Sequence, residues 1–183
     1  MSRSSKMSEK LQKKPRRTRL AAFIERYYIP RYLFERSIEV LRKRGRVKQE
    51  GLVLWAGATA INAEEAYVLS LIVPRRGHWG GGVRLGIETL LKLSKELEKR
   101  DLQLLAQVHT HPRNFGHSLG DENMATSFRL GYLSIVIPDF ALVEVRDLST
   151  CYVYEYQGNF KWRLLENDEI DQRFVIEDFL IRV

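Results

Sequence analysis

The sequence has little of what stabilises secreted proteins or anchors membrane proteins. Cys151 is the single cysteine among 183 residues, so no disulfide can form within the chain. No apolar run is long enough to cross a bilayer, and the N-terminus has no apolar segment of the kind found in a secretory leader. We therefore expect a cytoplasmic protein without a membrane partner, in which Cys151 is a packed thiol.

The net charge of +7 belongs to one end of the chain. Residues 1–19 contain eight of the 30 Lys and Arg residues and one of the 23 Asp and Glu residues, so residues 20–183 are neutral. A basic, polar segment without aromatic residues is typical of a disordered tail. Such a tail attracts nucleic acid by charge alone and cannot specify a sequence, so nucleic acid is not an expected partner. We predict a tail at 1–19 and one domain at 20–183.

The spacing of apolar residues predicts strands interleaved with helices. Residues 20–29 are interpreted as either a short helix or an extended arm, and Glu64 and Glu65 as a turn. Helices are predicted at 32–44, 83–99 and 122–128, and strands at 50–56, 66–73, 104–108, 132–137, 142–147 and 150–156. This order indicates an α/β fold, a single-domain sandwich of a mixed β-sheet flanked by helices. The helix at 83–99 is expected to pack on the sheet.

Three of the four histidines lie within nine positions, just after the strand predicted at 104–108. His109 and His111 are one residue apart, so on a strand they point to the same face. Asp121 follows in a loop that can return a carboxylate to them. Two imidazole nitrogens, one carboxylate oxygen and an open fourth position make a ligand set of a catalytic zinc site. Solvent-exposed histidines at a strand end are the alternative, and His117 is interpreted as a loop residue.

Glu50 precedes a strongly apolar strand and is the candidate general base. A hydrolytic zinc site needs a carboxylate outside the ligand shell that takes a proton from water and later returns it. Taken alone, Glu50 would more often be a solvated residue at the start of a strand. The glycine-rich segment 75–82 has no Walker pattern, and we interpret Trp79 within it as a residue that flanks the substrate channel.

Together these residues resemble the JAB/JAMM metalloprotease family, also called the MPN domain. Glu50 matches the family's glutamate, His109-x-His111-Pro112 its second block, and Ser118-x-x-Asp121 its third. The likeness covers about residues 30 to 165. The family usually has ten residues between the second histidine and the aspartate, whereas here nine precede Asp121 and ten precede Glu122. The spacing from Ser118 favours Asp121 as the ligand, with Glu122 as the alternative.

The resemblance implies the MPN arrangement, which is cytidine-deaminase-like, and a zinc-dependent peptidase activity. In that family the residues matched by His109, His111 and Asp121 hold Zn²⁺. The resemblance assigns to Glu50 the transfer of a proton from water to the leaving amine. It assigns to Ser118 the stabilisation of the oxyanion by hydrogen bonding.

The compact chain is similar to small prokaryotic members of the family. This likeness implies a deubiquitinase-like isopeptidase, or a precursor-processing peptidase, that cleaves after the tail of a ubiquitin-like protein. Such members are found with E1-like and E2-like partners, some in antiviral defence. The alternatives are release of an amino acid from a sulfur-carrier protein, a non-catalytic MPN scaffold, and a DNA-repair-like relative that uses the basic tail. The complete set of Glu50, His109, His111 and Asp121 argues against a scaffold, because scaffolds usually lose ligands.

Overall fold

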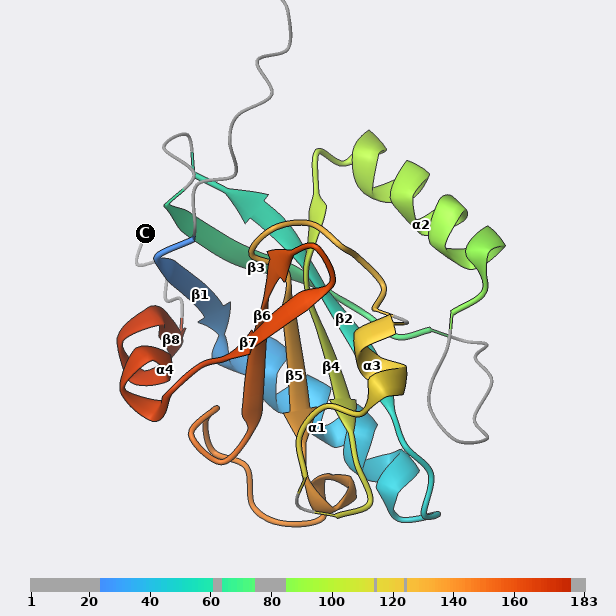
Figure 1. The fold of residues 1–183 in the computed structure, drawn as a ribbon, viewed down its shortest axis with the longest axis vertical. Helices are drawn as coiled ribbons and strands as arrows, with labels where there is room; N and C mark the ends of the chain where they lie inside the picture. Colours follow the sequence, from blue (N-terminus) through green and yellow to red (C-terminus); the bar gives the residue numbers. More distant parts are fainter. Residues whose placement is uncertain (1–23, 61–63, 75–84, 114, 124, 179–183) are drawn as a thin grey trace, which may run out of the picture.

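The computed structural model of this protein describes residues 24–60, 64–74, 85–113, 115–123 and 125–178, which are built around one eight-stranded sheet (Figure 1). The strand order is β7-β6-β5-β4-β2-β3-β1-β8. The strands are β1 (Arg26–Pro30), β2 (Leu52–Thr59), β3 (Glu65–Ile72), β4 (Gln103–Thr110), β5 (Leu133–Ile137), β6 (Tyr152–Gly158), β7 (Lys161–Leu164) and β8 (Phe174–Glu177). Three neighbouring pairs are parallel (β4–β5, β1–β3 and β1–β8) and the others are antiparallel. The expected α/β fold with a mixed sheet is therefore confirmed.

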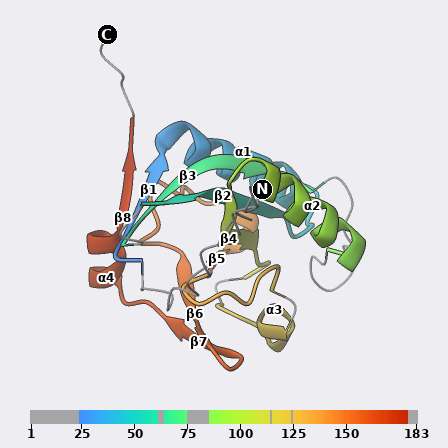
Figure 2. The same cartoon turned by 90° about the horizontal axis from the view of Figure 1, so that it is seen from above.

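The helices lie on both sides of the curled sheet (Figure 2). They are α1 (Arg31–Gly45), α2 (Ile87–Lys99), α3 (Leu119–Asn123) and α4 (Asn167–Arg173), with a short 3-10 turn, η1, at Asp139–Ala141. Apolar residues of α1 at helical spacing face the sheet and are buried: Leu33, Phe34, Ile38 and Leu41. Trp55 of β2 packs beneath this helix, and its indole N–H donates to Ser37 Oγ of α1 over 2.9 Å. The buried indole is thus satisfied, and α1 is held against the central strands.

The pairing of β2 with β4 brings two distant motifs together. Leu52 lies opposite His109 in this antiparallel pair. One step further, the Gly51 N–H donates to Thr110 Oγ1 over 2.8 Å, and the Thr110 N–H donates to Gly51 O over 3.1 Å. Because the strands run in opposite directions, the chain that precedes β2 lies beside the chain that follows β4. This register places Glu50 next to the His-x-His segment.

The strand predicted at 142–147 is wrong. The chain there bends away after η1, and no residue from 142 to 147 belongs to a strand. The guanidinium of Arg42 in α1 donates to the carbonyls of Ala141 and Val143, which ties the segment to the helix instead of to a neighbouring strand. Leu142 and Val143 are exposed, so their apolar character does not report burial in a sheet.

Two helix predictions also differ from the structure. The helix predicted at 122–128 is mostly wrong: α3 begins earlier, at Leu119, where Ser118 supplies hydrogen bonds that start it, and it ends at Asn123, so residues 125–128 are not helical. The helix predicted at 83–99 is observed as α2 over its described part, but it does not pack on the sheet as expected. Leu97 is the only buried residue in Ile87–Lys99, and the side of α2 that carries Leu91 faces an open groove of about 860 Å³. Glu65, interpreted as part of a turn, opens β3.

Helix α4 and strand β8 were not predicted, and a buried ion-pair network holds them. Glu155 of β6 is fully buried and is bonded by Arg173 at the end of α4, and its Oε2 lies 3.4 Å from Arg163 Nη2 of β7. Arg173 also donates to Ile24 O over 2.7 Å, which joins the two ends of the described chain. The partners are far apart in sequence, so no local pattern indicates them.

The remaining expectations concern the N-terminal tail, Trp79, Cys151 and membrane-spanning helices. The tail at 1–19, the boundary at residue 20 and Trp79 all lie outside the described residues. Cys151 is a buried free thiol, as expected. Within the described part of the chain, no helix combines the length and the apolar character needed to cross a membrane.

Candidate metal centre

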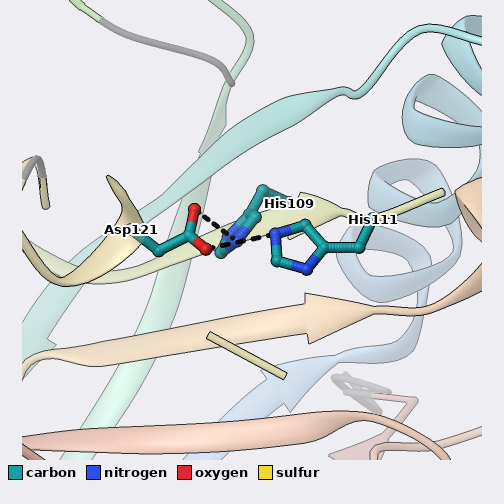
Figure 3. A group of neighbouring side chains, drawn as sticks. All are labelled: His109, His111 and Asp121. Carbon is teal, nitrogen blue, oxygen red and sulfur yellow. Dashed lines mark ion pairs between the residues drawn. The ribbon is translucent and has the colours of Figure 1, made fainter. Parts of the chain in front are cut away.

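The structure brings His109, His111 and Asp121 together (Figure 3). His109 Nε2 lies 3.3 Å from Asp121 Oδ1, and His111 Nε2 lies 3.2 Å from Asp121 Oδ2. One donor atom from each of the three residues lies within 4.8 Å of the others. His109 is the penultimate residue of β4, His111 follows the strand, and Asp121 is in α3. The carboxylate therefore reaches the imidazoles across a loop that is one residue shorter than the family pattern.

Ser118 determines where the aspartate points. Its Oγ and its backbone N–H both donate to Asp121 Oδ2 over 2.7 Å, while the Asp121 N–H donates back to Ser118 Oγ over 3.3 Å. These bonds start α3 and turn its first carboxylate toward the strand end. The described group of candidate ligands contains Asp121 and not Glu122. The Ser-x-x-Asp spacing thus has a local physical basis, and the assignment of Asp121 as a metal ligand stays a prediction.

A backbone contact selects the free nitrogen of His111. His111 Nδ1 lies 3.3 Å from Phe115 O, and the Phe115 ring packs 4.5 Å from the imidazole. A carbonyl oxygen can only accept, so Nδ1 carries the hydrogen and Nε2 presents its lone pair to the centre. Burial favours the neutral form, but the hydrogen bond and charge of Asp121, followed by the charge of Glu50, outweigh it and raise the pKa of His111.

The donor set fits a divalent metal. Both ring nitrogens of His109 are buried. Nδ1 has no hydrogen-bond partner among the described residues, and Nε2 lies 3.3 Å from Asp121 Oδ1. Burial would raise the pKa of Asp121, yet the hydrogen bonds from His109 and His111 hold it far below its usual range. The site therefore combines an ionised carboxylate with two imidazoles, one of them otherwise unpaired. A Zn²⁺ ion bound by His109 Nε2, His111 Nε2 and an Asp121 oxygen would satisfy these atoms and keep one coordination position open.

Glu50 is half-buried beside this centre and is not one of the grouped ligands. The pKa of its carboxyl is raised above the ordinary value. Burial is the largest cause and the charge of Asp121 adds to it, whereas His111 and His109 lower the pKa without cancelling the rise. A carboxylate in such surroundings is suited to take and return a proton. Ser118, by contrast, donates its hydroxyl hydrogen to Asp121 here, so its expected role at the oxyanion stays a prediction.

His117 is packed against aromatic residues that the sequence analysis did not indicate. The His117 ring stacks on Tyr154 of β6 at 3.7 Å and meets Trp162 of β7 edge-on at 5.2 Å. The His117 backbone N–H donates to Tyr154 Oη over 3.1 Å, and a Cβ on Gly116 would lie only 2.0 Å from that oxygen. Burial lowers the pKa of His117 to about 3, so its ring is neutral. No local signal marks these contacts, because β6 and β7 lie more than 30 residues further along the chain.

Comparison with known proteins identifies the family. The probable metalloprotease y4jG of Sinorhizobium fredii is 33% identical over 127 residues, which cover 67% of this chain and 76% of that protein. The motif residues Glu50, His109, His111, Ser118 and Asp121 are those of JAB/JAMM metalloproteases. This chain belongs to the JAB/JAMM family. No protein-family model matches the chain.

Solved structures bear on the fold of this JAB/JAMM protein. A solution structure of a protein from Desulfitobacterium hafniense is similar with a TM-score of 0.60 at 14% identity, covering 84% of this chain and 94% of that one. At this identity the likeness concerns the fold alone. A JAB1/MPN domain protein from Archaeoglobus fulgidus gives a TM-score of 0.46 at 16% identity, over 82% of this chain and 98% of that one, and nothing further rests on it.

Proposed function

We propose that this protein is a zinc-dependent peptidase or isopeptidase that cleaves after the C-terminal tail of a ubiquitin-like protein, either to release conjugates or to process a precursor. One observation carries the proposal. A half-buried carboxylate, Glu50, lies beside a group of His109, His111 and Asp121 that leaves a metal position open. The likeness to a probable metalloprotease supports the peptidase chemistry.

Each residue has a part that follows from its contacts. A zinc ion held by His109, His111 and Asp121 would supply a Lewis acid that lowers the pKa of a bound water toward about 7 and polarises the scissile carbonyl. Glu50 accepts the proton of the attacking water and gives it to the leaving amine. Asp121, fixed by Ser118, holds the ligand geometry. Burial of both histidines keeps competing solvent from them.

The ubiquitin-like substrate follows from the resemblance to small prokaryotic family members, as do E1-like and E2-like partners and a role in antiviral defence. The scaffold alternative is disfavoured, because scaffolds usually lack ligands and all four motif side chains meet in this chain. An active protein supports the catalytic hypothesis, and a protein that binds zinc without activity is the result that the scaffold alternative predicts.

The test compares wild type with Glu50→Gln on ubiquitin-like domains, each fused through its C-terminal tail to a reporter protein. We expect zinc-loaded wild type to cut at the end of the tail and Glu50→Gln to bind zinc normally while losing at least about 100-fold in turnover, because general-base catalysis contributes about 10² to 10⁴. Glu122→Gln, a neighbouring acid outside the ligand group, is the control and should stay active. Turnover retained in Glu50→Gln would disprove its role as base, and an inactive, zinc-loaded wild type would favour the scaffold.

A further inference from the structure

The turn between β6 and β7 contains a residue whose backbone conformation is unusual for its type. Gly158 and Lys161 are paired, so Asn159 and Phe160 form a two-residue hairpin loop, with φ of 51° and 57°. Two positive φ values are typical of a type I′ turn, in which asparagine followed by glycine is preferred. Phe160 occupies the glycine position, where a bulky residue is strained. Its side chain is 72% exposed, so burial does not explain its presence.

Phe160 is the outer end of a row of aromatic rings that leads to the metal centre. Its ring lies 5.5 Å from Phe128, which lies 5.6 Å from Tyr156, and Tyr156 lies 5.1 Å from Trp162. We call these four residues the aromatic wall. Trp162 in turn meets His117, whose ring is 6.3 Å from that of the candidate ligand His109.

The wall combines exposure with ring contacts that lead toward the candidate metal centre. Phe128 is 43% exposed, and Leu130 beside the hairpin is 44% exposed, so the apolar surface continues around the tip. Large aromatic side chains that are exposed in the free protein contribute strongly to binding once a partner covers them. A polypeptide whose scissile bond lies at the metal centre places its neighbouring residues along an adjoining surface. Trp162 and His117 are partly exposed and connect the wall to His109, whereas Tyr156 is buried and supports the exposed rings from within.

We propose that the aromatic wall binds an apolar segment of the protein substrate next to the scissile bond, so that this protein selects substrates with a large apolar side chain near the cleavage site. This inference rests on the proposed peptidase function. The strained turn supports it, because the turn holds Phe160 at the surface at a cost to folding, and the ring contact with Phe128 leaves the residue 72% exposed for a partner. It assigns a specificity role to Phe128 and Phe160, which the motif does not include.

The experiment uses the zinc-loaded full chain and a mixed library of peptides made by digesting a cell extract, with cleavage sites read by mass spectrometry. Wild type is compared with Phe160→Gly, which fits the positive φ and should not lower thermal stability. Asn159→Gly relaxes the same turn but keeps the aromatic ring, and Tyr32→Ala removes an aromatic residue that is 65% exposed on α1. A synthetic peptide pair with leucine or serine at the preferred position then gives kcat/KM for each variant.

We expect wild type and both controls to favour an apolar residue at one position beside the cut. Phe160→Gly should lose about tenfold in kcat/KM on the leucine peptide and little on the serine peptide, as expected when one anchor side chain is removed. Cleavage without an apolar preference, or a preference that Phe160→Gly retains, would overturn the wall and leave the peptidase function intact. Absence of Glu50-dependent cleavage of the peptides while the ubiquitin-like fusions are still cut would overturn the wall alone, and absence of cleavage of both substrates would overturn both proposals. A change of oligomeric state in Phe160→Gly would mean that a second copy of the chain covers the wall, which also overturns the proposal.

Discussion

Replacement of Ser118 by alanine tests how the aspartate is positioned. In Ser118→Ala, Asp121 loses the hydrogen bond of 2.7 Å that the hydroxyl donates to Oδ2, and its own N–H loses the acceptor at 3.3 Å. The backbone N–H of residue 118 still reaches Oδ2. The variant therefore keeps the carboxylate in place by one contact instead of two, while the backbone bonds from Asp121 and Glu122 to Ser118 O still hold the first turn of α3.

The size of the effect follows from these contacts. A hydrogen bond to a charged group is worth about 1.5–3 kcal/mol. Ser118 is exposed, so solvent competes, and loss of a serine at a helix start costs about 0.5–2 kcal/mol. A loss of about 1.4 kcal/mol corresponds to a tenfold weaker Kd for zinc. Loss of a residue that orients a metal ligand usually has an effect of this order.

The assay is a competition titration of zinc against a chromophoric chelator. Ser149→Ala is the matched control, because Ser149 makes the same hydroxyl and backbone contacts to the carboxylate of Asp147, which is not one of the grouped ligands. We expect a Kd about tenfold higher in Ser118→Ala and no change in Ser149→Ala. An unchanged Kd in Ser118→Ala together with a large fall in kcat would refute the positioning role and leave only the oxyanion role.

Three further predictions concern the loop, the core and the thiol. Gly116→Ala should weaken zinc binding at least tenfold, since its Cβ would lie 2.0 Å from a tyrosine oxygen; Gly86→Ala has open space and should not change the affinity. Arg173→Leu should lower the free energy of unfolding in urea by about 3 kcal/mol, because it removes one partner of the buried Glu155. Burial raises the pKa of Cys151 to about 12, so at pH 8 the thiol stays protonated and iodoacetamide should label it only after unfolding.

The sequence indicated the candidate centre well because most of its determinants are local. The alternation of His109 and His111 at the end of a strand corresponds to strand geometry. The three-residue spacing from Ser118 to Asp121 corresponds to a local hydrogen-bonding geometry, and neither needs a distant partner. Glu50 is different, since its place depends on the register of β2 against β4. The family motif supplied that long-range link, which periodicity alone could not.

The parts that were missed depend on contacts between distant segments. The 142–147 segment has strand-like composition, but hydrogen bonds from Arg42 hold it in a bend. Helix α4 and β8 depend on Glu155, a buried charge whose partners come from two other elements. The aromatic surroundings of His117 come from β6 and β7, so nothing near the histidine in the sequence reveals them.

The most direct test of the centre is the zinc content of purified protein, measured by elemental analysis in wild type, Asp121→Asn and Glu122→Gln. The side chains of His109, His111 and Asp121 face one another, so we expect about one zinc per chain in wild type and Glu122→Gln and a large loss in Asp121→Asn. Full zinc content in Asp121→Asn, or none in wild type supplied with zinc, would contradict the assignment of this site.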